Sequence, residues 1–229
     1  MMQSLHEHGF VVLSEVFSPE KCDALATAYD SAIDRGSEPD LRVFRDCSSV
    51  RLANLVRYDS AFEELLALGP VLAACEGVIG EKFKPSGLRA RTVIPGGAMQ
   101  SLHVDVAVDS SDWPLVGFII MVDEFRTDNG ATRFVPGSHK WAQEWKHAST
   151  NDRPGHRREV AACGTKGSVI VFNGSTWHGH GANITQSARR SMQGAYVPES
   201  GSCAQDWSSL SPEIRAHLPI STNKILGVQ

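Results

Sequence analysis

The chain has 229 residues, a formal net charge of −4 and 41% hydrophobic residues, as expected of one soluble globular domain. No apolar run reaches the roughly 18 residues that span a bilayer, the basic residues are scattered, and the N-terminus lacks the pattern of a secretory signal. These features argue against a membrane or nucleic-acid role and predict a cytoplasmic protein.

The first third of the chain, residues 1–80, is predicted to be mostly helical. Residues 10–13 form a short strand-like run. Ser18-Pro19-Glu20 then supplies an N-cap, a proline at the first helical position and an acidic first turn, which predicts a helix that continues to Ile33. Residues 60–79 repeat a helical pattern that breaks at Gly69-Pro70.

The sequence beyond residue 80 favours β structure. Its apolar runs are short, rich in β-branched residues and separated by turn residues, and they cover 88–94, 99–106, 116–122, 132–135, 168–172 and 189–197. Asn129-Gly130 separates two runs and predicts that the strands on either side are antiparallel neighbours. The pattern predicts one mainly β domain: N-terminal helices (1–80), a two-sheet jelly roll (81–200) and a C-terminal extension (201–229).

Three short segments contain residues that could carry chemistry. His103 and Asp105 are two positions apart on a strand-like run, so their side chains share one face and could hold one metal ion, although such pairs usually hydrogen-bond locally. His178 follows 73 residues after Asp105, beyond a buried strand. Two histidines and a carboxylate form the facial triad that suits Fe(II). His180 is a rival ligand by residue type.

An arginine pair lies on the strand that follows. The guanidinium of an arginine matches a carboxylate with two parallel hydrogen bonds. A pair such as Arg189-Arg190 is usually a surface feature when taken alone. The order of a His-x-Asp pair, a histidine and an arginine instead points to a metal with an acidic co-substrate.

Several segments resemble those of the phytanoyl-CoA dioxygenase family. They are residues 130–139 and 178–189, the run at 9–13 and the helix start at 18–20. The likeness extends from Gly9 to about Val197. Arg189 falls 11 residues and Asn183 five residues after His178, and both spacings are typical of that family.

The resemblance implies a double-stranded β-helix, a cupin-like jelly roll, with Fe(II) held by His103, Asp105 and His178. Arg189 would take the distal carboxylate of 2-oxoglutarate, and Arg190 would point to the opposite face of the strand. With O₂, such an enzyme hydroxylates, desaturates or cyclises a small molecule and releases succinate and CO₂. Halogenating relatives lack the carboxylate that Asp105 supplies here.

The resemblance also implies a wider co-substrate site with Asn183 and His180. The family often has a small hydroxyl residue where His180 stands, so His180 either bonds the co-substrate carboxylate or packs beside the loop. Two candidate substrate residues could instead have a purely structural role. Trp113 could pack between a strand and a loop, and Arg133 could be a charge at the edge of a sheet. The four candidate substrate residues are Gln100, Ser101, Trp113 and Arg133.

Two rival functions use the same residues. A cupin-type hydrolase or isomerase would bind Zn²⁺ or Mn²⁺ at the triad, and an inactive binding module would keep only the fold. Arg189 argues against the first, and the intact triad argues against the second. A CoA thioester would favour a basic groove, which a mildly acidic chain does not display, so an amino-acid derivative or natural-product intermediate is expected. The pattern gives no indication of oligomeric state.

Overall fold

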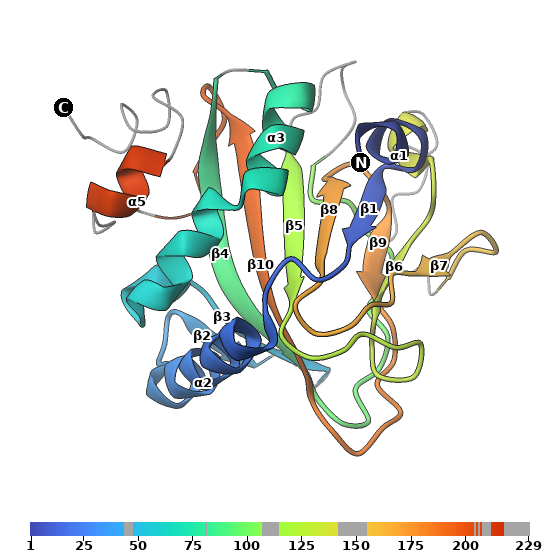
Figure 1. The fold of residues 1–229 in the computed structure, drawn as a ribbon. Helices are drawn as coiled ribbons and strands as arrows, with labels where there is room; N and C mark the ends of the chain where they lie inside the picture. The colour runs from blue at the N-terminus through green and yellow to red at the C-terminus, as the bar shows by residue number, and fades with distance from the viewer. Residues whose placement is uncertain are drawn as a thin grey trace.

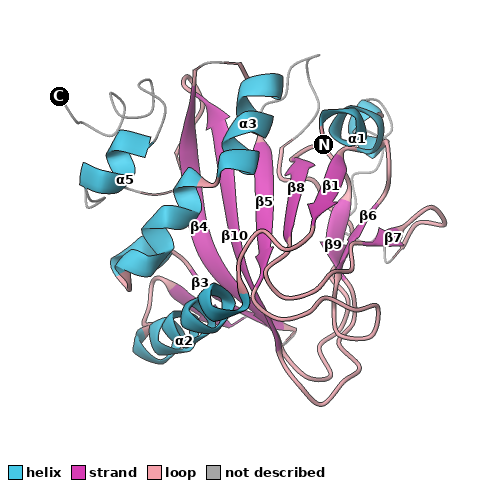
Figure 2. Cartoon of the chain, in the orientation of Figure 1, coloured by secondary structure: helices cyan, strands magenta, loops and turns pink. Residues whose placement is uncertain are grey.

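The computed structural model describes residues 1–43, 48–80, 82–106, 115–141, 155–203, 205, 207 and 212–217. Within these ranges two antiparallel sheets dominate the fold (Figures 1 and 2). The larger has seven strands in the spatial order β1 (Phe10–Leu13), β8 (Val169–Asn173), β5 (Val116–Met121), β10 (Arg189–Pro198), β4 (Phe83–Val93), β3 (Ser49–Leu52) and β2 (Leu41–Val43). The smaller has the order β7 (Val160–Ala161), β6 (Thr132–Phe134) and β9 (His178–His180).

Helices precede most of the strands and cover the outer face of the larger sheet (Figure 1). The helix at Ser18 begins as its sequence predicts, because the Ser18 side chain accepts a hydrogen bond from the Lys21 amide. Among the described helices, none combines the length and the apolar character needed to cross a membrane. The helical elements are α1 (Met2–His8), α2 (Pro19–Arg35), η1 (Leu55–Arg57), η2 (Ser60–Ala67), α3 (Gly69–Val78), η3 (Ser138–Lys140) and α5 (Pro212–His217).

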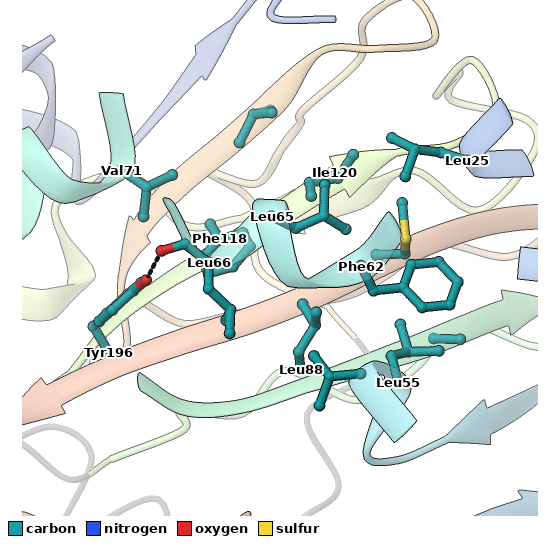
Figure 3. Close-up of a cluster of buried hydrophobic side chains, with 14 of the residues drawn as sticks. Leu25, Leu55, Phe62, Leu65, Leu66, Val71, Leu88, Phe118, Ile120 and Tyr196 are labelled. Atoms are coloured by element: carbon teal, nitrogen blue, oxygen red, sulfur yellow. Dashed lines mark hydrogen bonds between the residues drawn. The ribbon is translucent and has the colours of Figure 1, made fainter. Parts of the chain in front are cut away.

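The larger sheet separates two apolar cores because its side chains alternate between faces. Phe118 and Ile120 of β5 point outward to the helices, where Tyr196 donates a hydrogen bond to the carbonyl of Leu66 (Figure 3). Ile119 of the same strand points inward, to the core between the sheets. The strand residues therefore divide into one set that anchors the helices and one set that faces the interior.

Most of the predicted elements are present. The helix from residue 19, the helical stretch that breaks at residues 68–69, and strands close to five of the six predicted β runs are confirmed, as is the two-sheet jelly roll. The run 99–106 is the exception, because it forms no strand. Its only ladder contact among described residues is a single bridge between His103 and His178.

The predicted hairpin at Asn129-Gly130 is wrong, because β5 and β6 belong to different sheets. The side chain of Asn129 instead organises a wide loop: it accepts from the Arg126 amide at 2.8 Å and donates to the Glu124 carbonyl at 2.9 Å. Gly130 has a φ of 86°, which a residue with a side chain rarely adopts. The turn residues thus carry the chain from the larger sheet to the smaller one.

Candidate active site

Three potential metal ligands converge where the two sheets meet. His103 and His178 pair through two reciprocal backbone hydrogen bonds of 2.9 Å, and the Asp105 amide donates to the Gly174 carbonyl at 2.8 Å. Asp105 Oδ1 lies 4.0 Å from His103 Nε2, and Asp105 Oδ2 lies 3.8 Å from His178 Nε2. One ligand atom from each residue lies within 4.8 Å of the other two, so a single ion could contact all three.

Backbone carbonyls fix which nitrogen each imidazole presents. Nδ1 of His103 lies 3.3 Å from the Ser101 carbonyl, and Nδ1 of His178 lies 2.8 Å from the Thr176 carbonyl. A carbonyl only accepts, so each Nδ1 carries the proton and each Nε2 lone pair faces Asp105. Burial, together with the facing His178, lowers the pKa of His103 to about 4. His103 is therefore neutral at physiological pH, which is the form that binds metal.

The donor set and its surroundings fit Fe(II). Two imidazole nitrogens and one carboxylate lie on one side of the prospective ion, and the side chain of Asp105 is 26% exposed. The triad borders a cavity of about 570 Å³, a size suited to a small molecule. Leu115, Ile119 and Phe172 form apolar parts of its wall.

Arg189 lies beyond the cavity lining and is 1% exposed. Its Nη1 donates to Ser191 Oγ at 3.0 Å and its Nη2 to the Gly130 carbonyl at 2.6 Å, and the guanidinium carbon lies 4.1 Å from the centre of the Phe125 ring. Within the described ranges its Nε has no partner and no carboxylate pairs with it. Burial lowers its pKa to about 10, so it stays charged at neutral pH. A buried charge of this kind favours an anionic ligand.

The adjacent Arg190 points to the other face of β10, as the resemblance implied. It pairs with Asp123 and with Asp30 of α2, both at 2.7 Å. The Arg190 side chain is only partly buried, and its hydrogen bonds to Asp123 hold its pKa above the usual value. The two neighbouring arginines therefore differ: Arg190 links the larger sheet to α2, and Arg189 is buried in the interior.

Asn183 acts inside its own loop. Its amide nitrogen donates to the carbonyls of Val93 and Ser187, at 3.2 and 2.8 Å, and its Oδ1 accepts from the amide and the hydroxyl of Thr185, at 3.1 and 2.7 Å. Both donors and the acceptor are therefore used. Asn183 fixes the path of the chain from β9 to β10 and hence the start of the strand that carries Arg189, and no polar group is left over for a co-substrate.

Replacing Asn183 by aspartate should lower the free energy of unfolding of the metal-free protein by about 1–3 kcal/mol, because the buried hydrogen bond to the Val93 carbonyl and the bond to the Ser187 carbonyl both lose their donor. Urea denaturation without metal or co-substrate measures this. A residue that served only the co-substrate would leave this stability unchanged and would affect 2-oxoglutarate binding alone, which would contradict the loop role.

His180 lies in the cavity but outside the metal group. Its Nδ1 is 2.8 Å from the Gly181 carbonyl, and its Nε2 is buried without a partner among the described residues. Burial, with Arg91 as the next cause, lowers its pKa to about 3, so the ring is neutral. Because Nδ1 carries the single proton, Nε2 can only accept, and this does not suit a carboxylate.

The four candidate substrate residues have different settings. Gln100 lines the cavity, and its side-chain oxygen is buried without a partner in the described part of the chain. Ser101 and Arg133 do not line it: the Ser101 carbonyl orients His103, and Arg133 pairs with Glu159 and donates to the Gln100 carbonyl at 2.6 Å. Trp113 lies outside the described residues.

The arginines of the cavity wall were not predicted from the sequence as site residues. Arg89 and Arg91 of β4 and Arg51 of β3 line it, together with Thr132. A signal was present, because Arg89 and Arg91 alternate with Leu88 and Ala90 and alternation on a strand places two arginines on one face. The net charge of −4 describes the whole chain and gives no indication of this local positive charge.

The chain is similar in sequence to known dioxygenases. The family model of phytanoyl-CoA dioxygenase (PhyH) matches residues 5–191. Dioxygenase sphC of Aspergillus fumigatus is 26% identical over 212 residues, which cover 84% of this chain and 56% of that protein. Dioxygenase trt7 of Aspergillus terreus is 25% identical over 211 residues, covering 86% and 72%. Dioxygenase cdmA of Talaromyces verruculosus is 37% identical over 106 residues, covering 43% and 34%.

A solved structure shares the fold. The non-heme alpha ketoglutarate dependent epimerase SnoN from nogalamycin biosynthesis superposes with a TM-score of 0.73 at 16% identity, over 86% of this chain and 82% of the other. SnoN in complex with Fe3+, alpha ketoglutarate and nogalamycin RO gives a TM-score of 0.70 at 15% identity, over 87% and 82%. With its family match spanning both sheets and the converged triad, the chain belongs to the phytanoyl-CoA dioxygenase family.

Proposed function

We propose that the protein is an Fe(II)- and 2-oxoglutarate-dependent dioxygenase that hydroxylates, desaturates or cyclises a small molecule, with release of succinate and CO₂. The observation that carries the proposal is the triad, which places two imidazole nitrogens and one carboxylate around a common point beside a cavity. Iron bound there would supply O₂ activation.

The protein's own residues have distinct parts in this proposal. His103, Asp105 and His178 hold the metal, and the carbonyls of Ser101 and Thr176 keep both imidazole rings oriented. Arg189 binds the distal carboxylate of 2-oxoglutarate. A planar guanidinium with an unpartnered buried Nε supports that assignment.

Arg189 also weighs against the rival functions. A cupin-type hydrolase or isomerase with Zn²⁺ or Mn²⁺ at the same triad would leave a buried cation without a carboxylate, and so would an inactive binding module. A 2-oxo diacid satisfies the triad and the arginine together. The dioxygenase function explains both features with one ligand.

We also propose that residues 1–229 act as one domain, working on a small molecule in the cytoplasm and not on nucleic acid. One inner core lies between the two sheets, and the family match runs through both of them. The chain spans 56% of the length of the sphC dioxygenase.

Anaerobic addition of Fe(II) and 2-oxoglutarate tests the function. A weak visible charge-transfer band should appear, because a 2-oxo acid that chelates Fe(II) absorbs there. Succinate can replace 2-oxoglutarate as a control, since it has both carboxylates but no 2-oxo group. The proposal fails if the wild-type protein binds Fe(II) and gives no band.

A further inference from the structure

The cavity beside the triad contains a buried hydrogen-bond donor at the edge of β4. Gln205 is 9% exposed and lines the cavity. Its Oε1 accepts a hydrogen bond from the Leu88 amide at 3.0 Å, and its Nε2 is buried without a partner among the described residues. Because a backbone amide only donates, the contact with Leu88 fixes which end of the carboxamide is left over. That end is the donor.

The end of strand β3 explains why Gln205 can occupy this position. β3 pairs with β4 only as far as Ala90. The Leu88 amide lies beyond that point and has no further strand beside it in the described sheet, so the side chain of Gln205 takes the place of a strand. Trp207, two residues further on, is 3% exposed and donates from Nε1 to the Pro85 carbonyl at 3.0 Å. The segment that carries Gln205 is thus fixed on β4.

Gln205 lies apart from the proposed co-substrate site. Arg189 is opposite Val93, at the other end of β4. Leu88 is five residues before Val93, which at about 3.4 Å per residue is about 17 Å along the strand. The family match ends at residue 191, so Gln205 belongs to a part of the chain that the match does not cover. The co-substrate assigned to the triad and Arg189 therefore leaves Gln205 unused.

The triad lies at the same end of the larger sheet as Gln205, but across the cavity. The Asp105 amide donates to the carbonyl of Gly174, directly after β8. The row of paired residues that starts at Asn173 of β8 crosses β5 and β10 and ends at Pro85 of β4. β8 and β4 are therefore three strand spacings apart, about 14 Å at roughly 4.8 Å each. A ligand between the triad and Gln205 has to be elongated.

The wall between the triad and Gln205 suits an apolar molecule. Leu115, Ile119 and Phe172 line it on the side of the triad. Ala195 of β10 and Gly87 of β4, which are opposite each other, line it closer to Gln205. Small residues in a strand allow a ligand to approach the backbone closely. The wall therefore offers apolar contact and space, and Gln205 adds a donor at its end.

We propose that Gln205 is a specificity-determining residue, which donates a hydrogen bond to an oxygen of the substrate at the end remote from the reacting carbon. The substrate class is an elongated, largely apolar molecule with a carbonyl or hydroxyl oxygen at one end. A site built to bond such an oxygen rejects an analogue without it, because the buried donor then stays unpaired. This role rests on the proposed function, since it takes the reacting carbon to lie at the triad.

Binding of 4-phenylcyclohexanone and of 1-methylidene-4-phenylcyclohexane tests this role, because the second compound has a CH₂ group in place of the carbonyl oxygen. Equilibrium dialysis measures both affinities on anaerobic protein with Fe(II) and 2-oxoglutarate. Gln205→Met should lower the ratio of ketone to alkene affinity about fivefold, the effect of one neutral hydrogen bond. Gln3→Met is the control, because it removes a glutamine that donates to Glu7 on the surface of α1. It should leave the ratio unchanged.

Gln205→Glu separates recognition from anchoring. A glutamate can still accept from the Leu88 amide, but it presents an acceptor where Gln205 presents Nε2. At pH 8, above the usual pKa of a glutamate, the variant should prefer 4-phenylcyclohexanol, whose hydroxyl can donate, over the ketone. A residue that only anchored its segment to β4 would leave the preference as in wild type.

Three results would overturn the proposal: no binding of the ketone to wild type, an unchanged ratio in Gln205→Met, or an unchanged preference in Gln205→Glu. Failure of the proposed function would be seen separately, as absence of the charge-transfer band with Fe(II) and 2-oxoglutarate. In that case the same comparison on metal-free protein decides whether Gln205 bonds an oxygen acceptor in the cavity.

Discussion

Replacing His178 by alanine is expected to weaken Fe(II) binding by more than about a hundredfold. Loss of a group that merely orients a ligand costs about 10- to 100-fold, and His178 would itself be a ligand. The change leaves only two of the three protein ligands, His103 and Asp105. Anaerobic titration calorimetry with Fe(II) measures the affinity, and the charge-transfer band with 2-oxoglutarate should disappear in parallel.

His180→Ala is the matched control for that experiment. His180 lies on the same short strand, β9, two residues further on, and is likewise buried, but it lies outside the metal group. Its replacement should leave Fe(II) affinity close to that of wild type. Equal loss in both variants would make His180 a ligand and the assigned triad wrong.

Arg189→Ala should raise the dissociation constant of 2-oxoglutarate by about 30-fold or more while Fe(II) stays bound. Removing one partner of a buried charge pair costs at least about 2 kcal/mol, which corresponds to that factor. The pKa of about 10 means that the wild-type side chain is charged at neutral pH. Titration of the charge-transfer band with 2-oxoglutarate measures the constant.

Arg190→Ala separates this effect from damage to the sheet. Arg190 is the next residue of the same strand, but it faces α2 and pairs with Asp123 and Asp30. Its loss should lower the free energy of unfolding and leave the constant for 2-oxoglutarate unchanged. If both variants weakened 2-oxoglutarate binding equally, Arg189 would have no direct part in it.

The elements that could be predicted are those with a local signal. Ser18-Pro19-Glu20 starts α2 through a side-chain cap and a proline, both of which act within one turn. The partners of a strand depend on the whole topology, and therefore Asn129-Gly130 predicted a hairpin where the chain crosses between sheets. The short strands β2, β3, β7 and β9 gain stability from pairing and lack a pattern of their own.

The same limit applies to the site. His103, Asp105 and His178 could be proposed because residue type and spacing matched a known arrangement. The setting of Asn183 could not, because its amide group bonds to the Val93 carbonyl, 90 residues earlier in the chain, as well as to its own loop. The burial of Arg91 could not be predicted either, because it depends on the neighbouring strands β3 and β10, which the sequence alone does not identify.

Strand β4 has one face in the helix-covered core, through Leu88 and Ala90, and the other in the cavity, through Arg89 and Arg91. Substitutions of these arginines can therefore change the charge of the cavity while the packing of the strand against the helices stays as it is. For protein engineering, β4 is accordingly a place to vary the charge of the cavity without repacking the core.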